Sequence, residues 1–187
     1  KFSMKKVTVL LADGFEEIEA LTVVDLLRRA KVYVDTVSIT DDYTVRGAHG
    51  IPVQTEDLIT EIDFKESDMI VLPGGMPGTT NLKEDENVRK AVQEAYDDGR
   101  YVAAICAAPT ILADMGLLKG KRATCYPDME SEIEDAYLTG APVATDENII
   151  TSQGVGTAID FALKLIEVLI SEEKAVEIAD SIVYQRS

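Results

Sequence analysis

The chain has 187 residues, of which 46% are hydrophobic and 28% charged, and its formal net charge is −16. This composition is typical of a soluble globular protein, and the length suits one ordinary domain. The negative charge argues against nucleic acids and anionic membranes as partners, because both carry negative phosphates. No apolar run reaches the roughly 20 residues that span a bilayer. No signal peptide is recognised, and residues 1–3 are interpreted as a cloning remnant, which leaves 4–187 as the expected single domain.

Two cysteines, Cys106 and Cys125, are too few for a disulfide framework. Free thiols indicate a reducing compartment, so we expect a cytoplasmic protein. No metal site is expected, because the chain has one histidine, no paired-cysteine motif and no HExxH motif.

Apolar runs of strand length alternate with helical patterns along the chain. The first predicted helix carries acids in its first turn and arginines in its last, which suits the helix dipole. In the first half we predict strands at Lys5–Ala12, Val32–Ile39 and Asp68–Leu72, helices at Glu16–Ala30 and Asn87–Asp98, and short strands or a hairpin with a helical turn over residues 43–60.

The second half keeps the same rhythm. We predict strands at Tyr101–Ile105 and Arg122–Cys125, a hairpin of Pro142–Thr145 with Asn148–Thr151, a helical turn at Glu130–Asp135, and helices at Ala107–Met115, Thr157–Ile170 and Glu172–Ile182. Nearly all-apolar strands that alternate with helices indicate a doubly wound α/β fold, with a mostly parallel central sheet and helices on both faces. In this fold, ligands bind at the carboxyl ends of the strands.

Cys106 lies where one predicted strand turns directly into a helix. A nucleophile elbow is a tight turn that needs small residues two positions away, and Ala104 and Ala108 meet this need. The N–H groups at a helix start favour the thiolate, which is the reactive form. A buried structural cysteine is an equally good interpretation of the residue taken alone.

Two glycines, Gly74 and Gly75, follow a neighbouring strand. They allow the main chain to approach a ligand, and with the N–H of Ala107 they could form an oxyanion hole. Taken alone, the Pro-Gly-Gly segment is more simply a tight turn.

Three acids, Glu16, Glu17 and Glu19, open the first predicted helix. Most acids in a first turn are solvated partners of the helix dipole. A carboxyl that meets a thiolate in a closed crevice would instead stay protonated, and could donate a hydrogen bond to sulfur or relay a proton.

Four motifs, LLADGFEEIEAL, IVLPGG, AAICAAPTILA and TSQGVGTAIDFALKLIE, span nearly the whole chain in this order. Together they resemble the ThiJ/PfpI superfamily, in the branch of the parkinsonism-associated protein deglycase. The resemblance implies a flavodoxin-like sandwich, no cofactor, and a homodimer built partly on the first helix. It also implies that Cys106 is an oxidisable nucleophile, that Glu19 hydrogen-bonds its sulfur, and that Gly75 and Ala107 donate N–H groups to an oxyanion or to sulfinate oxygens.

The sequence departs from many superfamily members at one position. They carry a histidine after the strand that follows the elbow helix, whereas this chain has Tyr126 there, and its one histidine, His49, lies earlier. Tyr126 either lines the pocket or is a packed aromatic residue. His49 is more simply a loop residue than a group that reaches the crevice, even across a dimer. A structural role also fits the GVGT segment better than a phosphate cradle, and fits Cys125 better than a resolving thiol.

Three functions follow as hypotheses. The first is a cofactor-free enzyme whose Cys106 thiolate attacks small reactive carbonyls such as methylglyoxal, or early glycation adducts, with Glu19 moving a proton. The second is a non-enzymatic oxidative-stress sensor or chaperone switched by sulfinate formation at Cys106. The third, an intracellular cysteine protease or amidase, is disfavoured because no histidine follows Cys106.

Overall fold

The computed structural model describes residues 4–185, so residues 1–3, interpreted above as a cloning remnant, lie outside the described residues. The strands in this range are β1 Lys6–Leu11, β2 Tyr33–Ser38, β3 Thr44–Arg46, β4 Pro52–Gln54, β5 Asp57–Leu58, β6 Met69–Leu72, β7 Tyr101–Ile105, β8 Arg122–Ala123, β9 Tyr137–Leu138, β10 Val143–Asp146 and β11 Ile149–Ser152. The α-helices are α1 Glu17–Arg29, α2 Gly78–Glu84, α3 Glu86–Asp97, α4 Pro109–Asp114, α5 Ala158–Leu169 and α6 Glu172–Ser181. Single turns of 3-10 helix lie at Ile59–Glu61, Phe64–Glu66 and Val155–Thr157, with a longer one at Pro127–Ile133.

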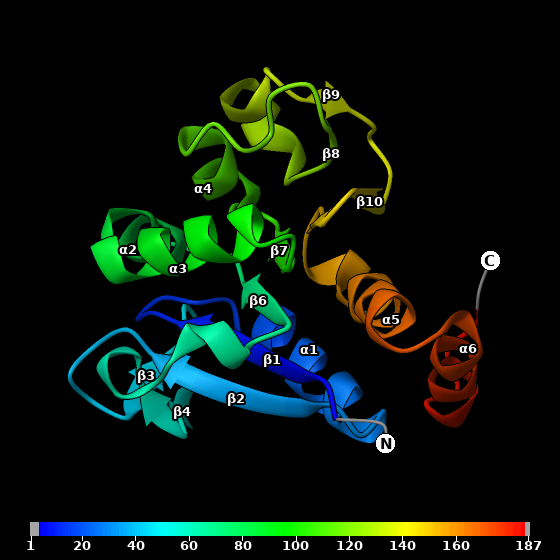
Figure 1. The fold of residues 1–187 in the computed structure, drawn as a ribbon, viewed down its shortest axis with the longest axis horizontal. Helices are drawn as coiled ribbons and strands as arrows, with labels where there is room; N and C mark the ends of the chain where they lie inside the picture. The colour runs from blue at the N-terminus through cyan, green and yellow to red at the C-terminus, as the bar shows by residue number, and fades with distance from the viewer. Residues whose placement is uncertain (1–3, 186–187) are drawn as a thin grey trace.

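A seven-stranded sheet in the order β10-β11-β7-β6-β1-β2-β5 forms the centre of the fold. Neighbouring strands are parallel except for the β10–β11 hairpin. Helices α2 and α3 lie on one side of these strands and α5 on the other (Figure 1). The predicted doubly wound, flavodoxin-like α/β fold is therefore confirmed.

Successive side chains of each strand point to opposite faces of the sheet, so the core has two layers. On β1, Val7, Val9 and Leu11 pack toward α1, α5 and α6, whereas Leu10 packs toward α3 and α4 on the opposite face. Both faces of the central strands are thus covered, which explains their nearly continuous apolar sequences.

Several elements differ from the sequence prediction, among them β8, which ends at Ala123 rather than at the predicted Cys125. Helix α2 was not predicted, because its GTTNLKE sequence is short and follows a Pro-Gly segment. Strand β9 was also missed, and it pairs with β8 in a separate two-stranded sheet. Helix α4 begins at Pro109 rather than Ala107, since proline lacks the N–H that a first helical turn leaves unpaired.

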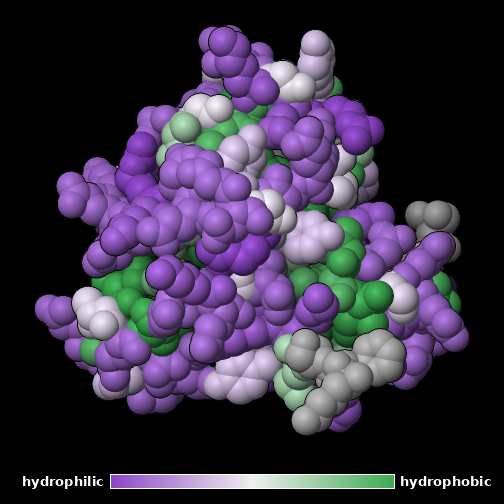
Figure 2. All heavy atoms as spheres, in the orientation of Figure 1, coloured by the Kyte–Doolittle hydropathy of each residue, from purple (hydrophilic) through white to green (hydrophobic). Residues whose placement is uncertain are grey.

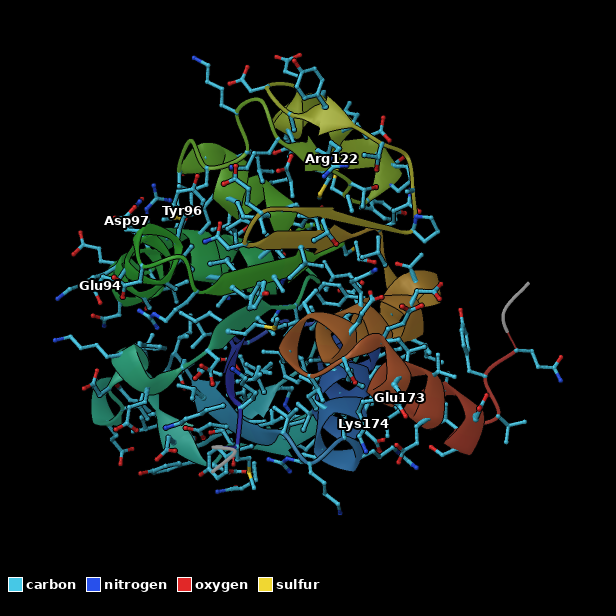
Figure 3. The ribbon with its side chains drawn as sticks, turned by 45° about the vertical axis from the view of Figure 1, so that its right-hand side comes forward. Glu94, Tyr96, Asp97, Arg122, Glu173 and Lys174 are labelled. Atoms are coloured by element: carbon cyan, nitrogen blue, oxygen red, sulfur yellow. The ribbon has the colours of Figure 1, made fainter. Side chains whose placement is uncertain are left out.

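The surface is mostly hydrophilic on the face seen in Figure 2, with hydrophobic atoms gathered in a few separate areas. Charged side chains such as Glu94 and Asp97 on α3 lie at the edge of the molecule (Figure 3). Among residues 4–185, no helix combines the length and the apolar character that a membrane crossing requires.

Candidate active site

Cys106 occupies the turn between β7 and α4, at the carboxyl end of a central strand. Its φ angle is 65°, in the left-handed region that is uncommon for residues other than glycine. The turn is fixed on both sides, because the Cys106 N–H donates to Ser152 O at 2.9 Å and the Cys106 carbonyl accepts from Tyr126 N at 2.8 Å. A strained residue held this firmly between strand and helix has the geometry of a nucleophile elbow.

Glu19 projects from the first turn of α1 into the interior and is fully buried. Its Oε1 accepts a hydrogen bond from the Gly74 N–H at 3.0 Å. Its Oε2 is buried and, within residues 4–185, makes no hydrogen bond of acceptable geometry. The Cys106 thiol is nevertheless close enough for its interaction with this carboxyl to shift the pKa of both groups. The structure thus brings together the two residues that the sequence singled out.

The two groups hold protons more tightly than usual. Burial raises the pKa of Glu19 to about 7 and the charge of Glu16 adds to the rise, whereas the interaction with the Cys106 thiol and the hydrogen bond from the Gly74 N–H lower it. Burial also raises the pKa of the Cys106 thiol to about 12. The negative charge of Glu19 raises this pKa further, whereas the hydrogen bond from the Ala107 N–H lowers it. The expected thiolate is therefore disfavoured, because burial and the nearby carboxylate outweigh the N–H groups of the turn. A thiolate forms most easily when its proton passes to Glu19.

Gly74 lies between these two residues, and only a glycine fits there. A Cβ at this position would lie 2.7 Å from Glu19 Oε1 and 2.8 Å from Cys106 Cβ. Gly75 has a φ of +94°, and a Cβ there would approach Glu16 N to 2.4 Å. The Pro-Gly-Gly segment is thus a close approach of main chain to the first helix, beyond a simple turn. Donation by Gly75 and Ala107 to an oxyanion stays a prediction.

Tyr126 lies beside Cys106 in the fold, and its role as a pocket residue stays a prediction. Its N–H donates to the Cys106 carbonyl, and its side chain is partly exposed. Gly154, in the loop after β11, completes this corner: a Cβ there would lie 3.8 Å from Tyr126 Cδ2 and 3.9 Å from Cys106 Sγ. The sequence predicted only a structural loop at Gly154. The pairing of β11 with β7 places this loop next to the Cys106 sulfur.

Glu16, Glu17 and His49 form a second cluster, in which one potential metal-ligand atom of each residue lies within 4.8 Å of the others. His49 Nδ1 lies 3.2 Å from Glu17 Oε1 and 3.4 Å from Glu16 Oε1. Each carboxylate also accepts main-chain hydrogen bonds: Glu16 from Glu19 N, and Glu17 from the N–H groups of His49 and Ile51. These bonds hold the pKa of Glu17 below its usual value, although burial opposes them. They account for the geometry of the cluster without a bound ion and tie the 47–51 loop to α1.

Cys125 is fully buried and packs in the core layer of α3 and α4. Burial raises the pKa of its thiol to about 11, with the charges of Glu130 and Glu132 adding. These surroundings support the packing interpretation of the second cysteine.

A flavodoxin-like sandwich with a cysteine on a strand-to-helix elbow defines the class of protein. The sequence profile of the DJ-1/PfpI family matches residues 5–168. The chain therefore belongs to the DJ-1/PfpI family.

Known relatives agree with this assignment. Protein DJ-1 homolog B of Arabidopsis thaliana is 40% identical over 97% of this chain, which spans only 42% of that relative's length. A Schizosaccharomyces pombe protein named glutathione-independent glyoxalase DJ-1 is 34% identical, over 91% of this chain and 94% of its own. The crystal structure of Drosophila melanogaster DJ-1beta superposes with a TM-score of 0.94 at 34% identity, covering 98% of this chain and 100% of that one.

Proposed function

We propose that the chain is a cofactor-free enzyme that acts on small reactive carbonyls through Cys106, with Glu19 as the proton carrier. The observation that carries this proposal is the buried Glu19 carboxyl, whose pKa is raised to about 7, beside a cysteine on an elbow. A general base works best when its pKa lies near the working pH. The name of the fission-yeast relative, a glutathione-independent glyoxalase, supports the same reaction class.

The proposed chemistry starts with addition of sulfur to the aldehyde carbon of methylglyoxal. The Cys106 proton passes to the Glu19 carboxylate as the S–C bond forms, and Glu19 then gives this proton to the new oxyanion, which yields a hemithioacetal and leaves the carboxylate ionised again. Glu19 then removes the proton from the former aldehyde carbon, and a proton returns to the neighbouring ketone carbon, which gives a lactoyl thioester. Water cleaves this thioester to lactate and the free thiol. The aldehyde carbon is oxidised and the ketone carbon reduced, so no external oxidant is needed.

A glycation adduct would enter the same sequence. A hemithioacetal or hemiaminal of methylglyoxal would transfer its carbonyl portion to Cys106 and release the repaired thiol or amine. This deglycase activity is part of the proposal, because it uses the same nucleophile and the same base.

The test is methylglyoxal consumption with lactate formation, measured for the native protein and for Cys106→Ser and Cys125→Ser. We expect native turnover, a loss of at least about 100-fold in Cys106→Ser, and near-native rates in Cys125→Ser, which changes only a buried packing thiol. Equal turnover by the native protein and Cys106→Ser, or no native turnover, would contradict the proposal.

A redox sensor is the second candidate function. Its support is the unpartnered Glu19 Oε2, which when protonated can donate a hydrogen bond to a sulfinate oxygen on Cys106. A solved relative from Toxoplasma gondii is described as oxidised. Peptide mass spectrometry after low peroxide should find two added oxygens at Cys106 and few at Cys125. Equal oxidation of both cysteines would count against this role.

We also propose that the chain forms a homodimer through α1 and works in a reducing compartment, the cytoplasm. Support for the dimer is a hollow of about 540 Å³ on α1, whose lining includes the apolar residues Ile18, Leu21, Leu26, Ile51, Ile159 and Ile182 as well as Glu17, Thr22, Asp25 and Arg29. Ile18 and Leu21 on α1 and Ile51 beside them are exposed. The other apolar residues of α1, Val23, Val24, Leu26 and Leu27, are buried within the protomer.

A further inference from the structure

Gly154 stands in the loop between β11 and the 3-10 turn Val155–Thr157. Thr157 fixes this loop, because its N–H donates to the Gly154 carbonyl at 3.0 Å and its Oγ1 accepts from the Gly154 N–H at 3.1 Å. The same Oγ1 lies 2.7 Å from Ser152 Oγ at the end of β11. The glycine is therefore held in place relative to the sheet and to Cys106.

Neither backbone nor packing requires a glycine at this position. The φ of Gly154 is 168°, which is extended backbone that any residue adopts. A Cβ there would meet only Tyr126 Cδ2 at 3.8 Å and Cys106 Sγ at 3.9 Å within 4 Å, both ordinary van der Waals distances. This contrasts with Gly74 and Gly75, where a Cβ would collide with neighbouring atoms.

The missing side chain leaves a space the size of one carbon atom against the sulfur and the tyrosine ring. A carbonyl carbon must come within about 3–3.5 Å of the nucleophile before it reacts. A methyl group fixed at the Gly154 Cβ position would occupy part of the volume through which that carbon and its substituent approach.

We propose that Gly154 is a specificity-determining residue, whose open face, together with the Tyr126 ring, holds the acyl group attached to the aldehyde carbon that Cys106 attacks. This inference rests on the proposed function and narrows its substrate class to α-oxoaldehydes with a hydrogen or small alkyl substituent. Tyr126 would form one side of this subsite and Gly154 the other, since a Cβ at Gly154 would lie within 4 Å of both Tyr126 Cδ2 and Cys106 Sγ.

The first arm of the test measures access to the sulfur and needs no turnover. Rates of Cys106 alkylation by iodoacetamide and by the bulkier N-ethylmaleimide are followed by peptide mass spectrometry in the native protein, Gly154→Ala and Gly156→Ala. Gly156 is the matched control, because a Cβ there meets nothing within 4 Å and the position lies in the same loop. We expect Gly154→Ala to slow N-ethylmaleimide at least tenfold and iodoacetamide less than threefold, and Gly156→Ala to match the native protein.

The second arm measures kcat/KM for glyoxal, methylglyoxal and phenylglyoxal in the same proteins. The native protein should turn over glyoxal and methylglyoxal and act poorly on phenylglyoxal, and Gly154→Ala should lose little with glyoxal and at least tenfold with methylglyoxal. Unchanged alkylation and unchanged substrate ratios in Gly154→Ala, with the thermal midpoint preserved, would overturn the inference. A native protein without turnover contradicts the proposed function alone, and the alkylation arm then still decides the role of Gly154.

Discussion

At the scale of single residues, the behaviour of the site depends on one proton between Glu19 and Cys106. Burial disfavours a charge on either group, and each negative charge disfavours the other. The pair therefore keeps one proton over a wide pH range, and the thiol is a weak nucleophile until the carboxylate accepts that proton. A thiol in such a site reacts slowly with alkylating agents but can still react with a carbonyl group that is held close to both side chains.

Replacing Glu19 with Gln should make the Cys106 thiol easier to ionise and at the same time lower the rate of catalysis. The substitution removes a charge that raises the pKa of Cys106, so iodoacetamide should label the thiol several-fold faster at pH 8. Turnover of methylglyoxal should fall by roughly 100-fold or more, because the proton acceptor is lost. The matched control is Glu84→Gln, which removes an exposed charge at the end of α2. Slower or unchanged labelling in Glu19→Gln would contradict the account of the shared proton.

At the scale of elements, the edge of the sheet contains a second buried acid. Asp35 on β2 is almost fully buried, and within residues 4–185 its Oδ1 has no hydrogen-bond partner. Burial raises its pKa from 3.8 to about 7, and hydrogen bonding and repulsion from Asp57 on the edge strand β5 add to this rise. The pairing of β2 with β5 is therefore strained whenever both acids are ionised.

Asp35→Asn should flatten the dependence of stability on pH. The unfolded chain loses the Asp35 proton near pH 3.8, whereas the folded chain keeps it to about pH 7. The free energy of unfolding should thus fall as pH rises through this window, by at most about 1.4 kcal/mol per pH unit from this group. Urea unfolding from pH 4 to 8 should show that the free energy of unfolding of Asp35→Asn rises relative to that of the native protein as the pH rises. The variant Asp41→Asn, at an exposed position, should show the same pH dependence of the free energy of unfolding as the native protein. A difference between Asp35→Asn and the native protein that stays constant with pH would contradict the raised pKa of Asp35.

Periodicity and turn residues predicted most elements, because the central strands and long helices bury continuous or regularly spaced apolar residues. The same patterns placed Cys106 at a turn and Glu19 at a helix start. They missed α2 and β9, which are too short to show a period. They could not place Gly154 at the sulfur, because that contact arises from the pairing of β11 with β7. They also predicted a thiolate, since sequence carries no measure of burial.

At the scale of the whole molecule, the exposed apolar residues on α1 contrast with a surface that carries a net charge of −16. Exposed apolar side chains gathered in one patch are typical of an interaction surface, whereas apolar side chains scattered singly are normal on a protein surface. Burial of this hollow against a second copy would offset the repulsion between two acidic protomers.

Leu21→Glu should therefore yield a monomer. The new carboxylate would be buried without a partner in the proposed interface, which costs more than the lost apolar contact. Light scattering after size-exclusion chromatography should give twice the chain mass for the native protein and the single mass for the variant. Val176→Glu, at an exposed apolar position on α6, should stay dimeric. A native monomer, or a dimeric Leu21→Glu, would contradict the proposed interface.

The pH dependence of kcat/KM for lactate formation from methylglyoxal decides whether Glu19 is the base that takes the Cys106 proton. Burial raises the pKa of Glu19 to about 7, and the ionised form is the active one. We expect a rate that rises from pH 6 to 8 with an inflection near 7, and a Glu19→Gln variant without that inflection. A native profile that rises only above pH 9, as expected for a thiol that ionises without help, would contradict it.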